Sequence, residues 1–144
     1  MVLKEEKRDL FNVPEDYYFA HCISADFGMG KGIVVEFNKR YNMKNELIKK
    51  YKINNWNGNG YCLSKDRVFN LITKEKYWNK PTYETLRQSL ESMKQEMLFF
   101  DGMVTKLAIP KIGCGLDRLQ WDKVKEIIKD VFNDMEVEIL VCYL

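Results

Sequence analysis

Short apolar runs that alternate with helical patterns are the feature that most constrains the fold of this chain. Apolar runs of strand length occupy residues 17–24, 61–63, 68–73, 106–109 and 137–143. Apolar residues recur at helical spacing in residues 33–41, 43–51, 82–97 and 124–132. Because this alternation is typical of a sheet covered by helices on both faces, we predict the α/β class. The expected architecture is a three-layer α/β/α sandwich with a mixed central sheet.

The chain is expected to form one domain. Neither an internal repeat nor a proline-rich linker interrupts its 144 residues, and a chain of this length can bury a substantial core. A turn at Lys65-Asp66 separates two of the apolar runs and predicts a β-hairpin. We therefore expect a single domain over residues 1–144.

Charge and cysteine usage narrow the class of protein. A formal net charge of +2 is too small to indicate nucleic-acid binding, and no apolar run reaches the length of a transmembrane helix. The segment MVLKEEKRDLF lacks the apolar core of a signal peptide, so we expect a cytoplasmic protein without membrane association. One histidine and four cysteines without a C-x-x-C spacing argue against a structural zinc site. Disulfides are not expected in a reducing compartment.

Two glycine clusters occupy equivalent places in this pattern. Gly28, Gly30 and Gly32 follow one apolar run, Gly113 and Gly115 follow another, and each cluster precedes a helical segment. Such turns direct backbone N–H groups into one concavity, and the start of a helix adds partial positive charge. Two such loops side by side would hold a diphosphate, although each could also be only a tight turn.

The standard nucleotide-binding motifs are not present. Around Gly30-Lys31 the P-loop pattern fails twice, because Ala25 replaces its first glycine and Gly32 replaces its Ser or Thr. The spacing of the first cluster is G-x-G-x-G, so the dinucleotide fingerprint G-x-G-x-x-G fails as well. A diphosphate ligand would have to be held in another way.

Two side chains near these loops are candidates for catalysis. Lys74 ends the apolar run VFNLIT, where partial burial would favour a nucleophilic amine. Asp117 ends the second glycine cluster and could act as a general base. The simpler alternatives are that the Lys74 side chain is only solvated, and that Asp117 either caps the start of the following helix or pairs with Arg118.

Cys114 is a further candidate nucleophile, since it lies near the start of a helix. The only histidine, His21, lies on a different strand, which disfavours a Cys–His enzyme. Burial in the core is the simpler role for the cysteines and for His21.

Several motifs together resemble those of the macro domains. They are DLF at 9–11, AHCIS at 20–24, MGKGI at 29–33, LITK at 71–74, KPTYETL at 80–86 and IPKIGCGLDRLQW at 109–121. The last motif, with LITK and KPTYE in order before it, is most similar to the terminal ADP-ribose protein glycohydrolase group. The resemblance extends from Asp9 to Leu144 and implies the macro domain fold.

The resemblance also implies a ligand and a reaction. The ligand would be ADP-ribose, and Lys74 would attack the anomeric carbon of its distal ribose to form a covalent lysyl–ADP-ribose intermediate. Asp117 would activate the sugar and then resolve the adduct. The resemblance implies no metal and no cofactor. The expected partners are ADP-ribose and ADP-ribosylated proteins, and a monomer is expected.

The resemblance assigns a larger set of residues to ligand binding: Asp9, Leu10, Ser24, Met29, Gly30, Lys31, Gly32, Ile33, Pro110, Lys111, Ile112, Gly113, Cys114, Gly115, Leu116 and Leu144. Asp9, Leu10 and Leu144 match positions at the adenine, and the two glycine clusters match the phosphate loops. Some positions depart from the pattern. Lys31 replaces a small residue, Arg8 stands where glycine is expected, and Cys142-Tyr143 replaces Tyr-Thr. The strand LKEEK before Arg8 is also unusually polar.

Three functions remain open at this stage. The first is a hydrolase that releases ADP-ribose from modified acidic side chains and that could also deacetylate O-acetyl-ADP-ribose. The second is a reader that binds ADP-ribose without chemistry, which would not require Lys74 and Asp117 together. The third is release of ADP-ribose from modified nucleic-acid bases, for which the basic segment KNELIKKYK could hold a strand.

Overall fold

Six strands form one mixed sheet in the computed structural model, which describes residues 1–99 and 104–144. They are β1 (Val2–Lys7), β2 (Tyr18–Ser24), β3 (Tyr61–Lys65), β4 (Val68–Lys74), β5 (Lys106–Ile109) and β6 (Glu138–Tyr143). Their order in the sheet is β1-β6-β5-β2-β4-β3. Neighbouring strands are parallel except for β3 and β4, which form the antiparallel hairpin predicted around Lys65-Asp66.

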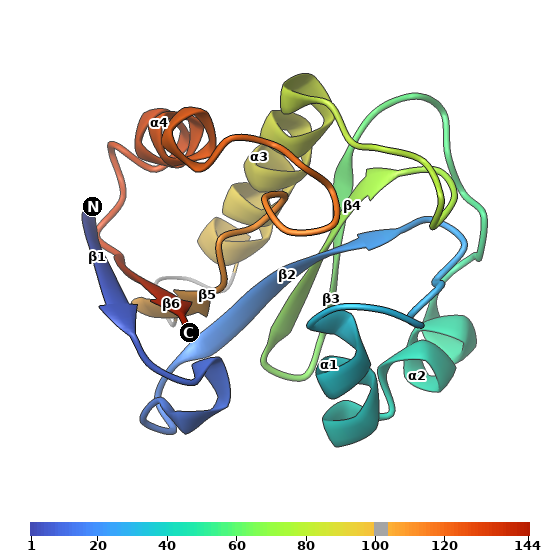
Figure 1. Ribbon diagram of the computed structural model, residues 1–144, viewed down its shortest axis with the longest axis horizontal. Helices are drawn as coiled ribbons and strands as arrows, with labels where there is room; N and C mark the ends of the chain where they lie inside the picture. The colour runs from blue at the N-terminus through green and yellow to red at the C-terminus, as the bar shows by residue number, and fades with distance from the viewer. Residues whose placement is uncertain (100–103) are drawn as a thin grey trace.

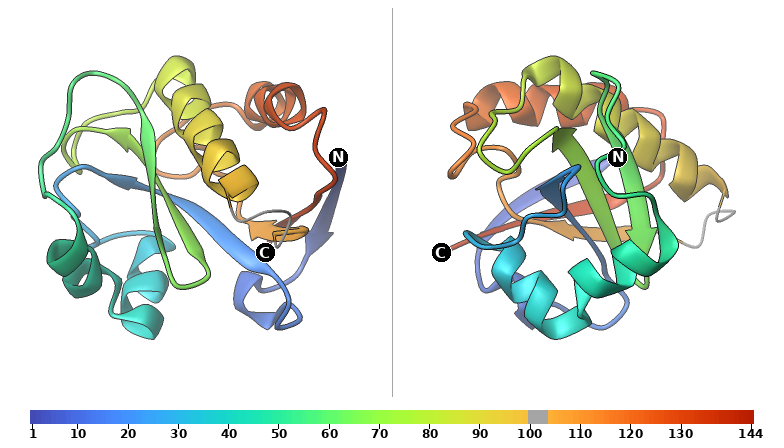
Figure 2. Two further views of the ribbon diagram at one scale, coloured as in Figure 1. Left: turned by 180° about the vertical axis from the view of Figure 1, so that it is seen from behind. Right: turned by 90° about the vertical axis from the view of Figure 1, so that its right-hand side faces the viewer.

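Helices cover both faces of this sheet. They are α1 (Val34–Tyr41), α2 (Met43–Lys50), α3 (Tyr83–Phe99) and α4 (Trp121–Val131), with a short 3-10 helix, η1 (Leu10–Asn12). Helices α3 and α4 lie on one face, and α1 and α2 lie on the other (Figures 1 and 2). The predicted three-layer sandwich with a mixed central sheet is therefore confirmed. No helix in the described parts of the chain is long and apolar enough to cross a membrane.

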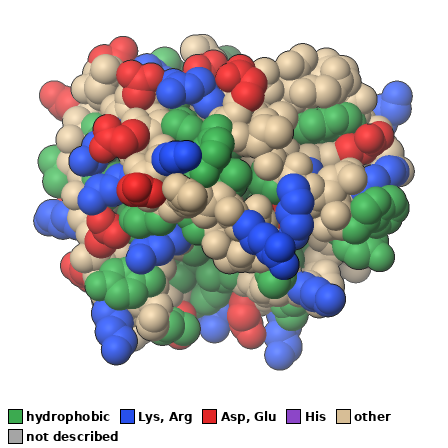
Figure 3. Space-filling model, turned by 45° about the horizontal axis from the view of Figure 1, so that its top comes forward, with side chains coloured by type: hydrophobic (Ala, Val, Ile, Leu, Met, Phe, Trp, Pro, Cys, Tyr) green, Lys and Arg blue, Asp and Glu red, His purple; other side chains and the backbone are tan. Residues whose placement is uncertain are grey.

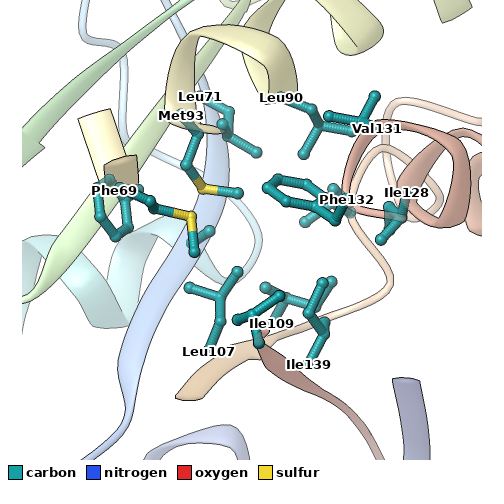
Figure 4. Packing of buried hydrophobic residues seen from close by; sticks show 14 of the residues in the cluster. Phe69, Leu71, Leu90, Met93, Leu107, Ile109, Ile128, Val131, Phe132 and Ile139 are labelled. Atoms are coloured by element: carbon teal, nitrogen blue, oxygen red, sulfur yellow. The ribbon is translucent and has the colours of Figure 1, made fainter. Parts of the chain in front are cut away.

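Strand alternation divides the core between the two faces, because successive side chains of a strand point to opposite sides. In β4, Phe69 and Leu71 pack on the side of α3 and α4, whereas Val68 and Ile72 pack on the side of α1 and α2. Phe132, directly after α4, is fully buried between that helix, α3 and the sheet (Figure 4). Both faces of the central strands are therefore apolar, as a sheet between two helical layers requires.

The polar segment LKEEK lies in β1, at the edge of the sheet. This strand pairs in parallel with β6 alone, and most of its side chains are exposed. An edge strand tolerates charges that a central strand would exclude, and charges there discourage pairing with another chain. The unusual polarity of this strand therefore follows from its position.

The connections that follow β2 and β5 place two loops side by side at the carboxyl ends of these strands. These two neighbouring parallel strands lead to helices on opposite faces, since β2 is followed by α1 and β5 by α4. In an open α/β sheet, a crevice forms beyond the carboxyl ends of strands where the connections diverge in this way. Both glycine clusters begin at these two strand ends.

Candidate active site

The first glycine loop, residues 25–33, joins β2 to α1. Gly32 has a φ of 79°, a conformation that glycine adopts without strain, and its carbonyl accepts from Val35 as the helix begins. Asp26 organises the start of this loop, because its Oδ1 accepts hydrogen bonds from the Ser24 hydroxyl and from the Gly28 N–H. Burial alone would raise the pKa of Asp26. These two bonds and one from the Tyr77 N–H outweigh it and hold that pKa below its usual range.

The second glycine loop, residues 110–120, joins β5 to α4. Gly113 has a φ of 73°, and a Cβ there would lie 2.9 Å from the Cδ1 atom of Leu119. The Gly113 carbonyl accepts from the Leu119 N–H at 2.7 Å, so the loop closes on itself. The sequence places glycine here because both the left-handed backbone and the close approach exclude a larger residue.

The two glycine loops approach each other. A Cβ on Gly32 would lie 3.5 Å from the Cδ1 atom of Leu116, at ordinary contact distance. Gly30 and Gly115, by contrast, are exposed and would meet nothing within 4 Å if they carried a Cβ. The loops therefore leave open backbone on either side of the place where they meet, which is what close approach of a ligand to main-chain atoms requires.

An irregularity at the end of β4 positions Lys74. Ile23 of β2 pairs with Ile72, but the next residue, Ser24, pairs with Lys74, so Thr73 is an extra residue in β4. A bulge of this kind redirects the side chains that follow it and is common beside active sites. Thr73 is buried, and its hydroxyl has no hydrogen-bond partner within the described residues.

Lys74 and Asp117 form an ion pair between β4 and the second glycine loop. Lys74 Nζ lies 2.7 Å from Asp117 Oδ1, and the two side chains are only 13% and 15% exposed. This pairing is the geometry that proton exchange between an amine and a carboxylate needs. The structure therefore brings together the two residues predicted to be catalytic.

A groove of about 630 Å³ begins at the glycine loops and extends along the surface. The predicted ligand-binding residues that line it are Asp9, Leu10, Ile33, Pro110, Lys111, Cys114, Gly115 and Leu144. We call it the Leu144 groove. Leu10 is buried in its floor, whereas Leu144 is almost fully exposed at its rim. Asp9 caps η1, since its carboxylate accepts from the Phe11 N–H at 2.9 Å.

The other predicted ligand-binding residues lie in the loops or beneath them. Met29 and Ile112 are buried and anchor the two glycine loops in opposite cores. Ser24 is also buried, with its hydroxyl on Asp26. Lys31 and Leu116 are exposed on the two loops. Among these predicted ligand-binding residues, the buried ones therefore support the loops, and only the exposed ones present side chains at the surface.

Six further residues line the Leu144 groove that the sequence did not assign to ligand binding: Arg8, Phe11, Glu36, Arg40, Cys142 and Tyr143. The Arg40 guanidinium lies 4.4 Å from the centre of the Phe11 ring. Glu36 and Arg40 follow Ile33 at positions i+3 and i+7 of a helix, which places all three on one face. That spacing is visible in the sequence and could have indicated that these three residues line one side of the groove.

Cys114 is not suited to be a nucleophile. Burial raises the pKa of its thiol to about 11, so the thiol form prevails at neutral pH. The pKa of Cys22, which is half-buried beside the ion pair, is also raised, chiefly by desolvation. All four cysteines are free thiols. Among residues 1–99 and 104–144, no group of three or more His, Cys, Asp and Glu side chains could hold a metal ion.

The fold is that of a macrodomain. The macrodomain of Mycobacterium tuberculosis DarG matches with a TM-score of 0.81 at 19% identity, covering 99% of this chain and 98% of that one. Thermosipho africanus DarTG in complex with ADP-ribose matches with a TM-score of 0.72 at 16% identity, covering 98% of this chain and 41% of that one. At these identities the likeness establishes the fold, which confirms the resemblance to macro domains.

A relative with higher sequence identity defines the family. No protein-family model matches the chain. The bovine protein named ADP-ribose glycohydrolase OARD1 is 44% identical over 137 residues, which cover 94% of this chain and 87% of that protein. The chain therefore belongs to the OARD1 family of macrodomain proteins.

Proposed function

We propose that this protein is a hydrolase that releases ADP-ribose from modified acidic side chains. The observation that carries the proposal is the 2.7 Å contact between Lys74 Nζ and Asp117 Oδ1 beside two glycine loops. The 44% identical relative is named an ADP-ribose glycohydrolase, and a structural neighbour was solved with ADP-ribose. The ligand and the reaction that we propose agree with both names.

Each part of ADP-ribose has a place in the proposed complex. The exposed backbone of the two glycine loops would accept the pyrophosphate, because N–H groups at a glycine turn and a helix start favour an anion. The Leu144 groove would accept the adenosine, with Leu10 as its apolar floor and Asp9 at its edge. The distal ribose would then extend from the pyrophosphate toward Lys74 and Asp117.

The first chemical step we propose forms a covalent intermediate. Asp117 takes one proton from the Lys74 ammonium, and the freed amine attacks the anomeric carbon of the distal ribose. A bond forms between Nζ and this carbon, while the bond from the carbon to the ester oxygen breaks. The departing carboxylate takes the proton from Asp117 and leaves as an acid.

The second step returns the enzyme to its resting state. Asp117, again a carboxylate, takes a proton from a water molecule that attacks the same carbon. The bond to Nζ breaks, free ADP-ribose forms, and the proton passes from Asp117 to the Lys74 amine. For O-acetyl-ADP-ribose we propose a different step, in which Asp117 takes a proton from a water molecule that attacks the acyl carbon, the bond from that carbon to the ribose oxygen breaks, the oxygen takes the proton from Asp117, and acetic acid leaves.

Substitution of Lys74 tests the proposal. In Lys74→Ala we expect release of ADP-ribose from a glutamate-modified protein to fall to background. ADP-ribose binding should be retained, because the variant loses the nucleophile but keeps the two glycine loops and the Leu144 groove. Lys74→Arg is the matched control: it keeps the cation beside Asp117 but cannot act as a nucleophile at neutral pH, so it should also be inactive. Release and binding are measured by product chromatography and calorimetry.

Two outcomes would contradict this function. Turnover retained by Lys74→Ala would remove lysine from the mechanism, and turnover present in Lys74→Arg but lost in Lys74→Ala would leave lysine an electrostatic role only. A wild-type protein that binds ADP-ribose but releases nothing from any modified substrate would instead be a reader of the modification.

A further inference from the structure

Two Asn-Gly pairs lie in the loop between α2 and β3, on the outside of the molecule (Figure 1). They are Asn57-Gly58 and Asn59-Gly60, and the chain contains no other such pair. Asparagine followed by glycine is prone to spontaneous deamidation, because glycine carries no Cβ to hinder attack of its backbone nitrogen on the asparagine side chain. Since the two pairs have the same composition, we expect any large difference in their reactivity to come from the folded structure.

The second pair is held by a side chain of α3. Gln88 Oε1 accepts from the Gly60 N–H at 2.7 Å, and Gln88 Nε2 donates to Asn59 Oδ1 at 3.0 Å. Gly60 also packs directly on α3, because a Cβ there would overlap the Thr85 carbonyl oxygen. The Gly60 nitrogen is therefore hydrogen-bonded and fixed, and it would have to leave Gln88 before it could attack the Asn59 side chain.

The first pair lacks this restraint. Asn57 and Gly58 are both exposed, and in the described part of the chain no group accepts a hydrogen bond from the Gly58 N–H. Gly58 has a φ of 95°, and a Cβ there would meet nothing within 4 Å. Its backbone nitrogen can therefore turn toward the Asn57 side chain without breaking a contact.

A backbone donor also faces the side chain under attack. The Asn59 N–H donates to Asn57 Oδ1 at 3.1 Å, which folds the Asn57 side chain back over its own backbone. This oxygen becomes negative when a nucleophile adds to Cγ, and a donor already in place stabilises that charge. Asn59 Oδ1 has a donor in Gln88 too, so the two pairs differ chiefly in the freedom of the attacking nitrogen.

We propose that Asn57 is a site of spontaneous deamidation and that Gln88 protects Asn59 from the same reaction. The Gly58 nitrogen gives up its proton to a solvent base and attacks Asn57 Cγ. A bond forms between this nitrogen and Cγ, the bond from Cγ to Nδ2 breaks, and the departing nitrogen takes a proton and leaves as ammonia. Water then adds to either carbonyl of the resulting succinimide, and the ring opens to aspartate or isoaspartate.

The reaction adds a carboxylate where the chain carries no charge. Acidic and basic side chains intermingle on the face drawn in Figure 3, whereas residues 53–60 contain neither kind. The same loop is attached to the first glycine loop, because the Asn54 N–H donates to the Ala25 carbonyl at 2.8 Å. The modification therefore lies on a segment that contacts the candidate active site, although the proposal does not depend on the function proposed above.

Peptide mapping by mass spectrometry tests the proposal on wild-type protein incubated at mildly alkaline pH. Asn57 should deamidate about tenfold faster than Asn59, because the hydrogen bonds to Gln88 must break before Gly60 can react. The rate at Asn57 should rise with pH, since the attacking nitrogen must lose its proton. Equal rates at the two sites, faster reaction at Asn59, or no deamidation at Asn57 would overturn the proposal.

Two further measurements assign the difference to Gln88 and to the fold. Gln88→Ala should raise the rate at Asn59 toward that at Asn57, whereas Gln95→Ala, which removes the same exposed-side amide further along α3, should change neither rate. In concentrated urea the wild-type chain should deamidate at similar rates at both sites. An unchanged rate at Asn59 in Gln88→Ala, or a tenfold difference that persists in urea, would contradict protection by Gln88.

Discussion

Lys74 and Asp117 are 43 residues apart in the chain, yet their charged atoms lie 2.7 Å apart in a largely buried contact. Burying an ion pair costs desolvation free energy that its attraction does little more than offset. Stability alone is therefore a weak reason for this pair to exist. Its position at the end of a bulged strand, beside two glycine loops, favours a chemical role.

Gly113 is the residue at which the second glycine loop is most sensitive to substitution. Gly113→Ala should lower the free energy of unfolding by about 1–3 kcal/mol, because alanine is strained at this φ and its Cβ would meet Leu119. Gly30→Ala is the control, since a Cβ there meets nothing within 4 Å and the change should stay within about 0.5 kcal/mol. Urea unfolding measures both, and equal effects would show that the loop is not under this constraint.

His21 makes folding dependent on pH. It is fully buried on the Phe37 ring, and burial lowers its pKa to about 4 despite a 2.7 Å hydrogen bond with Asn70 Oδ1. Between pH 6.5 and 4 the unfolded chain therefore binds a proton that the folded protein excludes, so stability falls as the pH is lowered through this range.

The contribution of His21 should amount to about 3 kcal/mol between pH 6.5 and pH 4. His21→Gln removes the titrating group, so the difference between wild type and variant in the free energy of unfolding should shrink or reverse as the pH falls. Urea unfolding at several pH values measures this difference. A pH-independent difference would mean that the pKa of His21 is the same in the folded and unfolded protein, which would contradict this account.

At the scale of the structural elements, Asp26 joins three segments. Its carboxylate accepts from the Ser24 hydroxyl at the end of β2, from the Gly28 N–H in the first glycine loop and from the Tyr77 N–H in the segment between β4 and α3. The segment between β4 and α3 therefore depends on the same side chain as the loop that we propose binds pyrophosphate. Loss of this carboxylate should disturb both.

Asp26→Ala should weaken ADP-ribose binding by roughly tenfold and lower the free energy of unfolding by about 1–3 kcal/mol, because the partly buried donors of Ser24 and Gly28 lose their acceptor. Asp16→Ala removes the same charge at an exposed ion pair with Lys106, where a change within about 1 kcal/mol is expected. Calorimetry and urea unfolding provide the two readouts. Binding that is equally affected in both variants would point to net charge instead of loop geometry.

The helices and strands could be predicted from the sequence because their signals are local. The helix expected over residues 33–41 is α1 (Val34–Tyr41), and the final run over 137–143 is β6 (Glu138–Tyr143). Glycine clusters after apolar runs likewise indicated the two loops, and the match of short motifs to macro domains indicated the ligand and the roles of Lys74 and Asp117.

Contacts between distant segments could not be predicted in the same way. The role of Asp26 depends on Tyr77, which lies 51 residues further along the chain, and neither residue alone signals the contact. The bulge at Thr73 depends on register with β2, and the stacking of Arg40 on Phe11 depends on how α1 packs beside η1. Such features follow from tertiary packing, to which local patterns are insensitive.

At the scale of the whole molecule, the site exists because the sheet order brings β5, β2 and β4 side by side. The carboxyl ends of these parallel strands supply the second glycine loop, the first glycine loop and Lys74 in turn. The Leu144 groove adds residues from near both ends of the described chain. These parts extend from Arg8 to Leu144, so the proposed activity requires segments from almost the whole length of the chain.

Intact-protein mass spectrometry of Asp117→Ala, incubated with a glutamate-modified protein, tests the central claim most directly. We predict a mass increase of one ADP-ribosyl group, located on Lys74 by peptide mapping, because in the variant the Lys74 ammonium can lose its proton to solvent and still attack, whereas no base remains to activate the water that resolves the adduct. The added mass should be absent from the double variant Lys74→Ala, Asp117→Ala. An adduct on another residue, or a Lys74 that stays unmodified while ADP-ribose is released, would contradict the account.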